Sequence, residues 1–152
     1  MKILMVCLGN ICRSPMADGL LRHKVAETGL NVEVDSSGTA GYHVGAAPDK
    51  RMRATAKSFG ITIDNLKARK FVVEDFDRFD VIYAMDESNQ SNILQLARNS
   101  KDAAKVKMIL NEIYPGENRS VPDPYYGGDQ GFIEVYQMLD QATDKIINDL
   151  KG

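Results

Sequence analysis

The residues best placed to do chemistry stand near the start of the chain, where five residues separate Cys7 from Arg13 and Ser14 follows directly. The thiolate of a cysteine is a strong nucleophile. The guanidinium of an arginine presents a planar fork of donors that fits two oxygens of a phosphate group. The spacing alone also occurs by chance, and a cysteine in an apolar run is usually a core residue. The neighbouring pattern decides between these interpretations.

The segment between Cys7 and Arg13 has the composition of an anion-binding loop. An apolar run ends at Cys7 and a Ser-Pro pair leads into a helical pattern, so the loop turns from a strand into a helix. Such a turn can point backbone N–H groups inward, and the helix N-terminus adds unpaired donors. The same surroundings favour a thiolate at Cys7. The predicted phosphate-binding residues are Leu8, Gly9, Asn10, Ile11, Cys12, Arg13 and Ser14.

A thiolate that displaces an alkoxide or a phenolate from phosphorus needs an acid to protonate the leaving group. Asp123 is the candidate, because prolines on both sides stiffen the backbone and would hold its carboxyl group in place. Tyr125 and Tyr126 follow and offer aromatic surface for an aromatic substrate. Neither His23 nor His43 lies near the loop in the sequence, and we expect His23 on a helix surface. The sequence therefore predicts Cys7 as nucleophile, Arg13 as clamp and Asp123 as general acid.

Short apolar runs alternate with helical patterns along the chain, with no repeat and no linker between domains. This order predicts the α/β class: a doubly wound four-stranded parallel sheet with helices on both faces, in a single domain of residues 1–152. Ligands of such sheets bind beyond the carboxyl ends of the strands, where the loop after Cys7 and the Asp123 segment would both lie. Strands are expected at 3–7, 32–35, 80–85 and 105–110, and helices at 15–28, 49–59, directly after Asp86, and at 132–150.

Composition limits the classes of partner. The chain has 43% hydrophobic and 26% charged residues with a net charge of -2, an ordinary globular balance that does not favour nucleic acid or an anionic membrane. The apolar run 3–8 is too short for a signal peptide or a membrane span, so we expect a cytoplasmic protein. In a reducing compartment, Cys7 and Cys12 are expected as reactive or buried thiols.

The chain resembles the low-molecular-weight protein tyrosine phosphatases over essentially its whole length. The eight residues from Cys7 to Ser14, continued by Pro15, are similar to the phosphate-loop signature of that family. The segment 123–126 resembles its general-acid loop, and the stretches 35–39, 48–51 and 84–86 resemble further landmarks. Two separate motifs in the correct order make the likeness specific.

This resemblance implies a phosphotyrosine-protein phosphatase, a phosphoric monoester hydrolase that works through a phosphocysteine intermediate. It would act on phosphotyrosine-containing proteins or aryl phosphates, and inorganic phosphate or other oxyanions would inhibit it. The family implies no metal ion and no cofactor. The family likeness also implies a monomer.

The same resemblance assigns roles to further residues. Asn10, Ser14 and Ser36 would support the phosphate loop. Cys12 would be a redox partner that traps oxidised Cys7 as a reversible disulfide. The substrate crevice would be lined by Leu8, Tyr42, Tyr125 and Tyr126.

The sequence departs from the family in two places. Many relatives carry a histidine in the stretch that corresponds to residues 64–67, where it holds the loop asparagine. This chain has none there, and Asn65 is the candidate substitute. Position 42 is tyrosine, where some relatives carry tryptophan, which would change substrate preference.

Three other functions are weighed against this one. A thiol-dependent arsenate reductase shares the fold and loop but needs further cysteines downstream, and none follows Cys12. A phosphocysteine carrier of a sugar-transport system would need neither Arg13 nor a separate acid. A phosphotyrosine-binding module would need no nucleophile. The phosphatase is the interpretation that uses all three predicted catalytic residues.

Overall fold

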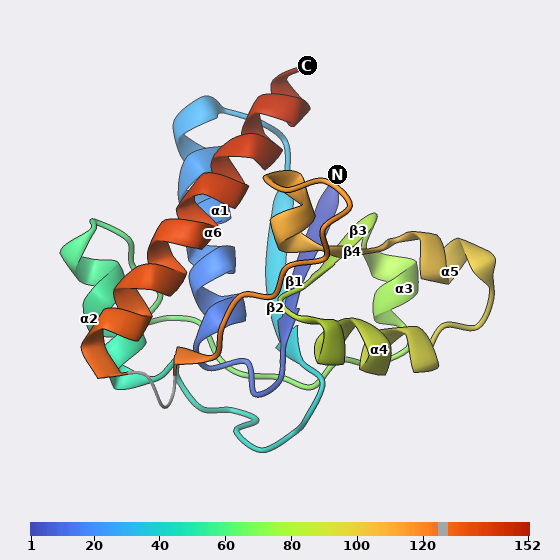
Figure 1. The fold of residues 1–152 in the computed structure, drawn as a ribbon, viewed down its shortest axis with the longest axis horizontal. Coiled ribbons are helices and arrows are strands. Elements are labelled where there is room, and N and C mark those ends of the chain that lie inside the picture. The colour runs from blue at the N-terminus through green and yellow to red at the C-terminus, as the bar shows by residue number, and fades with distance from the viewer. Residues whose placement is uncertain (125–127) are drawn as a thin grey trace.

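Four parallel strands form the centre of the protein, whose computed structural model describes residues 1–124 and 128–152 (Figure 1). The strand order is β2-β1-β3-β4, and every neighbouring pair is parallel. The chain moves outward from β1 in both directions, which confirms the doubly wound α/β sheet. The strands are β1 (Lys2–Cys7), β2 (Glu33–Gly38), β3 (Val81–Ala84) and β4 (Val106–Met108).

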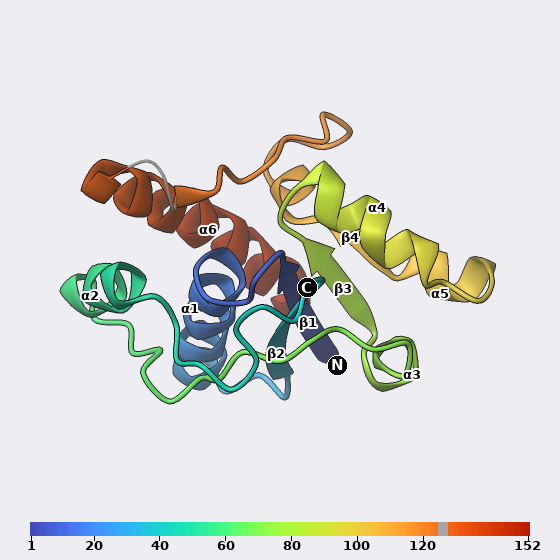
Figure 2. The same cartoon turned by 90° about the horizontal axis from the view of Figure 1, so that it is seen from below.

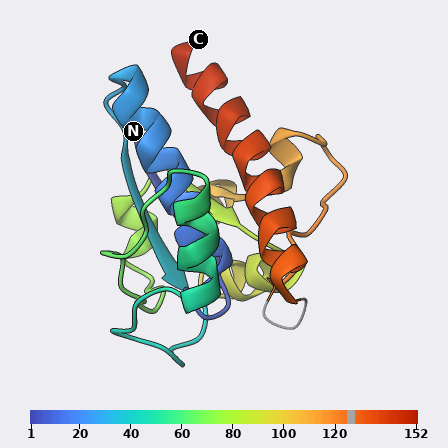
Figure 3. The same cartoon turned by 90° about the vertical axis from the view of Figure 1, so that its left-hand side faces the viewer.

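Helices cover both faces of the sheet (Figure 2). One face carries the long helices α1 and α6 together with α2, which Figure 3 shows from the outside. The other face carries the shorter helices α3, α4 and α5. The helical elements are α1 (Arg13–Thr28), α2 (Lys50–Ser58), α3 (Asp75–Arg78), α4 (Glu87–Gln95), α5 (Ser100–Ala104), the 3-10 helix η1 (Ile109–Glu112) and α6 (Gly128–Lys151).

The central strand β1 explains why its sequence is a continuous apolar run. Side chains alternate between the two faces of a strand. Ile3, Met5 and Cys7 belong to the core under α1 and α6, and Leu4 and Val6 to the core under α3 and α4. Because both faces are covered, every position of the strand after its first residue is buried. Cys7 is therefore the last residue of a strand held firmly on both sides.

Several element boundaries differ from those expected. Strand β2 runs on to Gly38 instead of ending at Asp35, because Ser36 and Ser37 pair with Met5 and Val6 of β1 and are buried. Strand β4 has three residues, and the chain continues as η1 where a strand had been expected up to residue 110. Helix α6 begins four residues earlier than predicted, and α3 and α5 were not predicted. Helix α4 begins directly after Asp86, as expected, and Asp86 caps it by accepting a hydrogen bond from the Asn89 N–H at 2.7 Å.

Candidate active site

The loop that follows β1, residues 8–12 (the phosphate loop), lies at the carboxyl edge of the sheet. Its backbone is held by neighbouring segments: Thr39 N–H donates to the Cys7 carbonyl at 2.9 Å, and Asp49 N–H donates to the Ile11 carbonyl at 2.7 Å. Asn10 has a φ of 58°, a left-handed conformation that asparagine adopts more readily than most residues with a side chain. A side chain at Gly38 would meet the Leu8 carbonyl oxygen at 2.7 Å, so glycine is needed where β2 passes the loop.

Side chains behind the loop fix its shape and orient a hydrogen atom toward the sulfur of Cys7. The amide nitrogen of Asn10 donates to Ser14 Oγ at 2.8 Å and to Ser36 Oγ at 3.0 Å. Ser14 Oγ therefore accepts one hydrogen bond and keeps its own hydrogen to donate. Cys7 Sγ lies 3.0 Å from Ser14 Oγ, whereas the alternative acceptor, the Ser37 carbonyl, lies at 3.4 Å. This geometry suits a thiolate at Cys7 that accepts from Ser14.

The other end of the Asn10 amide is held by the backbone of Arg69, whose N–H donates to Asn10 Oδ1 at 3.0 Å. This contact takes the place expected for Asn65, which is exposed. The guanidinium of Arg69 is itself fixed by ion pairs of 3.0 Å to Asp35 and 3.0 Å to the fully buried Asp75. The segment that holds Asn10 is therefore tied to both β2 and the start of α3.

Arg13 begins α1 and is almost wholly buried, with 4% of its side chain exposed. Its Nη1 donates to Asp86 Oδ2 at 2.7 Å and to the Val121 carbonyl at 3.0 Å, and its Nη2 lies 3.9 Å from Asp123 Oδ2. Burial opposes the charged guanidinium, but the charge of Cys7 and the hydrogen bond and charge of Asp86 outweigh it and raise the pKa of Arg13. Both hydrogen bonds use Nη1, so Nε and Nη2 make none to the described part of the chain.

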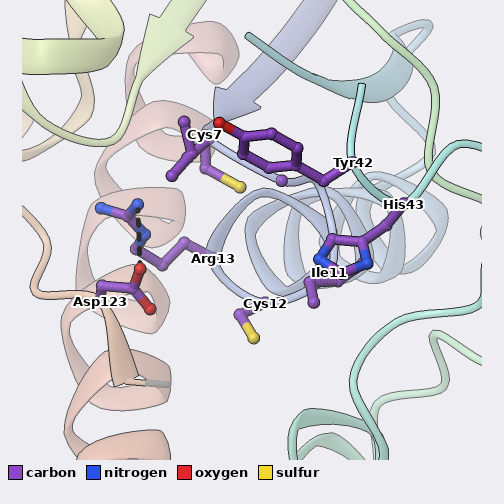
Figure 4. Close-up of a pocket in the computed structure, with 9 residues that line it drawn as sticks. Cys7, Ile11, Cys12, Arg13, Tyr42, His43 and Asp123 are labelled. Carbon is purple, nitrogen blue, oxygen red and sulfur yellow. Dashed lines mark ion pairs between the residues drawn. The ribbon is translucent and has the colours of Figure 1, made fainter. Parts of the chain in front are cut away.

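These groups meet in one pocket of about 280 Å³ (Figure 4). Three of its exposed lining residues, Tyr42, His43 and Asp123, are called the rim below. In the close-up, Arg13 and Asp123 lie on one side of the pocket, and Tyr42 and His43 on the other, with the sulfur of Cys7 between them. The full lining is Cys7, Leu8, Gly9, Ile11, Cys12, Arg13, Tyr42, His43 and Asp123.

The structure places the sequence-predicted residues in two groups. The predicted nucleophile, clamp, acid and crevice residues Leu8 and Tyr42 line the pocket. Asn10, Ser14 and Ser36 lie behind the loop and are buried. Tyr125 and Tyr126, also predicted for the crevice, lie outside the described residues. His43 was not predicted for the site, and only its position after Tyr42 could have indicated it.

Asp86 and Arg69 are the other residues that sequence reasoning did not assign to the site. Asp86 was expected directly before a helix and within the family landmark 84–86, with no role at the site, and the structure shows that its second carboxylate oxygen holds Arg13. Arg69 acts through a backbone N–H, which any residue except proline possesses. No side-chain pattern could have marked that contact.

The two cysteines differ although both are buried, unpaired and on the pocket wall. Burial raises the pKa of the Cys12 thiol, and the negative charges of Asp49, Cys7 and Asp123 raise it further. Cys12 has no side-chain capping bond at the start of α1. Cys12 is therefore held as a thiol, and Cys7, beside Ser14 and Arg13, is the sulfur suited to attack.

Two structural features bear on other classes of site. Among the described residues, no cluster of three or more His, Cys, Asp or Glu side chains has an arrangement that could hold a metal ion. In the same part of the chain, no helix is both long and apolar enough to cross a membrane.

Comparison with known proteins gives the same family from sequence and from structure. Residues 2–152 match the model of the family described as low molecular weight phosphotyrosine protein phosphatase. The chain is 44% identical over 141 residues to the Schizosaccharomyces pombe protein of that name, covering 91% of this chain and 89% of that one. The human protein of the same name is 39% identical over 138 residues, covering 90% of this chain and 87% of that one.

Solved structures agree with this assignment. A protein tyrosine phosphatase from Entamoeba histolytica, with Hepes in its active site, superposes with a TM-score of 0.92 at 38% identity, over 99% of this chain and 97% of that one. A drosophila arginine phosphatase superposes with a TM-score of 0.92 at 32% identity, over 100% of this chain and 99% of that one. The fold and these comparisons define a phosphatase of the α/β class. The chain belongs to the low molecular weight phosphotyrosine protein phosphatase family, for which a phosphocysteine intermediate is typical.

Proposed function

We propose that this protein hydrolyses phosphotyrosine with Cys7 as nucleophile, Arg13 as phosphate clamp and Asp123 as general acid and base. The observation that carries the proposal is the single pocket that brings these three side chains together from β1, α1 and the segment after η1. The family assignment supports the reaction class, and the pocket geometry supports the role of each residue.

The first step transfers the phosphoryl group to the enzyme. The Cys7 thiolate attacks phosphorus and forms a P–S bond while the bond from phosphorus to the phenolic oxygen breaks. Asp123, protonated at this stage, gives its proton to that oxygen, so tyrosine leaves neutral. Asp123 can reach a group at the mouth of the pocket because 43% of its side chain is exposed.

The second step returns the enzyme to its starting state. Asp123, now a carboxylate, takes a proton from water as the water oxygen attacks phosphorus. The P–S bond breaks, releasing inorganic phosphate and the Cys7 thiolate. The hydrogen bond from Ser14 stabilises that thiolate as a leaving group.

Arg13 and the phosphate loop stabilise the charge that spreads over the phosphoryl oxygens in the transition state. Asp86 and the Val121 carbonyl both hold Nη1 of Arg13. That leaves Nε and Nη2 as the two donors for a bidentate contact to phosphate. The guanidinium is fixed before substrate arrives, so little reorganisation is needed during reaction.

Apolar groups at the pocket favour an aromatic leaving group. Leu8, Ile11 and the ring of Tyr42 line it beside the phosphate loop, and these surfaces suit the faces of a phenyl ring. The structural likeness to an arginine phosphatase makes phosphoarginine the substrate to test in parallel.

Substitution of the nucleophile tests the proposal directly. Cys7→Ser should hydrolyse p-nitrophenyl phosphate no faster than a blank, since an alcohol at this position is not ionised, yet it should still bind vanadate. Cys12→Ser is the matched control, because it removes the neighbouring buried sulfur and should keep the phosphocysteine route. Appreciable turnover by Cys7→Ser, or a wild-type enzyme that hydrolyses phosphoarginine but not phosphotyrosine, would contradict the assignment.

We also propose that Cys12 protects Cys7 from irreversible oxidation. A peroxide would oxidise the Cys7 thiolate to a sulfenic acid, and the Cys12 thiol would then condense with it, forming a disulfide and releasing water. Both sulfurs line the same pocket, which supports the proposal. After peroxide treatment the wild type should recover activity with dithiothreitol, whereas Cys12→Ser should recover little; equal recovery would contradict it.

The remaining proposals concern the setting of the enzyme. We propose a single phosphatase domain that acts as a cytoplasmic monomer on phosphotyrosine-containing proteins or aryl phosphates, without binding nucleic acid or membranes and without a metal cofactor. The net charge of -2 supports the exclusion of nucleic acid. Light scattering of the purified protein tests the monomer, and activity unchanged by EDTA tests the absence of a metal requirement.

A further inference from the structure

His43 is the one ionisable rim residue for which the proposed reaction has no use. It lies in the loop between β2 and α2, and its carbonyl accepts from the Ala46 N–H at 2.8 Å, which closes a turn. Gly45 N–H and Ala68 N–H then bond this loop to the segment before Arg69, each at 2.8 Å. The backbone that carries His43 is therefore fixed from two sides.

The imidazole of His43 is seated on the phosphate loop. A side-chain carbon added at Gly9 would stand 3.2 Å from Cδ2 of the ring, so the ring lies against the Gly9 backbone. The Tyr42 ring meets it edge-on, with centroids 6.5 Å apart. No hydrogen bond joins either ring nitrogen to a residue in the described ranges 1–124 and 128–152. The ring is thus positioned by packing while its polar atoms keep their hydrogen-bonding capacity.

The opposite side of the pocket is rich in carboxylates. A second hollow of about 410 Å³ adjoins the pocket there and shares Leu8, Arg13 and Asp123 with it. Its lining includes the carboxylates of Asp86, Glu87 and Asp123, and its one cation, Arg13, already pairs with Asp86. A negatively charged neighbour of the phosphotyrosine would be repelled on that side and accepted on the side of His43.

We propose that His43 selects phosphotyrosine substrates that carry a carboxylate beside the phosphorylated residue, by donating a hydrogen bond from its imidazole to that carboxylate. The inference rests on the proposed phosphatase function and adds a substrate class to it. Cys7, Leu8, Tyr42 and His43 line the same pocket. With the phosphoryl group at Cys7 and the aromatic ring between Leu8 and Tyr42, the flanking residues of the peptide would reach the exposed rim at His43.

Protonation of the imidazole would turn this hydrogen bond into an ion pair, so the interaction should strengthen as the pH falls. The other titratable or charged groups on the pocket are Cys7, Cys12, Arg13, Tyr42 and Asp123. A ratio of rates between two peptides that differ only beside the phosphotyrosine removes the effects that both peptides share. The contribution of His43 is then the difference in this ratio between the wild type and His43→Gln at the same pH.

The experiment compares kcat/KM for three phosphotyrosine peptides with Glu, Gln or Lys on both sides of the phosphorylated residue. Wild type should prefer the Glu over the Gln peptide about two- to fivefold at low pH, the size expected for an exposed ion pair. The ratio should be smaller at about pH 7.5 than at about pH 5.5. His43→Gln should bring the ratio near one at both pH values, and His43→Arg should keep the preference at both.

His23 supplies the matched control. It is the only other histidine and lies on α1 with Nε2 3.2 Å from Glu27 Oε1, so His23→Gln should keep the wild-type ratios. Rates on p-nitrophenyl phosphate, which has no flanking residue, normalise each variant.

Three outcomes would overturn the inference. His43→Gln could keep the wild-type ratio, the wild type could prefer the Lys peptide, or His43→Gln could lose as much rate on p-nitrophenyl phosphate as on the Glu peptide. The last result would mean that the imidazole contacts the phosphoryl group and not the flanking carboxylate. Failure of the wild type to hydrolyse any of these substrates would instead refute the phosphatase function itself.

Discussion

The phosphate loop and the rim of the pocket are built in contrasting ways. The loop is supported by side chains that are almost fully buried, with Asn10 at 2%, Arg13 at 4% and Ser14 at 0% exposure. The rim projects into solvent, with Tyr42 75% exposed and the Asp123 side chain 43% exposed. The contrast separates two tasks: binding a compact dianion whose shape never varies, and meeting leaving groups and flanking residues that do vary.

The same contrast appears in how the two regions are held. Each polar atom of the Asn10 amide has a protein partner, and those partners come from α1, β2 and the segment before α3. Electrostatic catalysis depends on such prior orientation, because dipoles that are already aligned do not have to rearrange as charge develops. The rim residues belong to loops between elements, where a change of side chain disturbs little else.

The largest effect in either region after loss of the nucleophile is expected at Asp123. Asp123→Asn keeps size and polarity but cannot deliver a proton, so kcat/KM should fall by about 10²- to 10⁴-fold on poor phenolic leaving groups. The loss should be much smaller on p-nitrophenyl phosphate, whose leaving group needs little protonation. A plot of log kcat/KM against leaving-group pKa should therefore become steeper.

Asp129→Asn is the control for this series, since it removes an exposed carboxylate at the start of α6. It should leave the slope unchanged. If Asp123→Asn lowered kcat/KM equally for all leaving groups, Asp123 would act in substrate binding and not in proton transfer. Its task would then be that of the phosphate loop, although it lies on the rim.

A smaller effect, on both rate and stability, is expected for Asn10. Asn10→Ala leaves the buried partners of the Asn10 amide without their hydrogen bonds. It also forces alanine, which has no polar side chain to form a local hydrogen bond, into the left-handed conformation at a φ of 58°. We expect kcat/KM to fall about 10- to 100-fold, since the bonds to Ser14, Ser36 and Arg69 each contribute about 0.5–1.5 kcal/mol. Asn10→Gly removes the same bonds without backbone strain, so it should lose similar activity with less loss of thermal stability.

Asn118 is the matched control for Asn10. Among the described residues, these two are the ones other than glycine that have a positive φ, and the φ of Asn118 is 52°. Its amide also pairs with a side chain, Asn111, at 2.9 Å. Asn118→Ala should lower the melting temperature and leave kcat/KM unchanged. If Asn10→Ala behaved in the same way, the buried network would serve the fold alone and the distinction between loop and rim would fail.

The sequence predicted the loop better than its supports, for a physical reason. Cys7, Gly9, Asn10, Arg13 and Ser14 act through local geometry, where a strand turns into a helix, and this leaves a pattern at fixed spacing. The parallel sheet follows from alternating apolar runs, and it places Asp123 at the same edge without any contact being known. The family resemblance added Ser36, whose bond to Asn10 the structure shows.

Contacts without a local pattern were missed. Arg69 holds Asn10 through a backbone N–H from 59 residues away. His43 reaches the pocket because the loop before α2 is pinned to residue 68, which no periodicity indicates. Helices α3 and α5 have four and five residues, too few for an apolar stripe to show. Strand β2 runs longer than its apolar residues suggest because pairing with β1 overrides the preference of Ser36 and Ser37 for a loop.

The smallest effect is expected at Tyr42, where the informative result is whether KM or kcat changes. Tyr42→Ala removes one aromatic wall, so KM for aryl phosphates should rise about two- to tenfold, the range for one aromatic contact, with little change in kcat. Tyr42→Phe should behave as wild type if the ring face makes the contact. Val44→Ala, which trims a 62% exposed residue in the same loop that is not among the pocket-lining residues, controls for loop disturbance. A loss in kcat as large as that of Asn10→Ala would mean that the exposed rim orients the reacting groups, and the division of tasks between the two regions would be wrong.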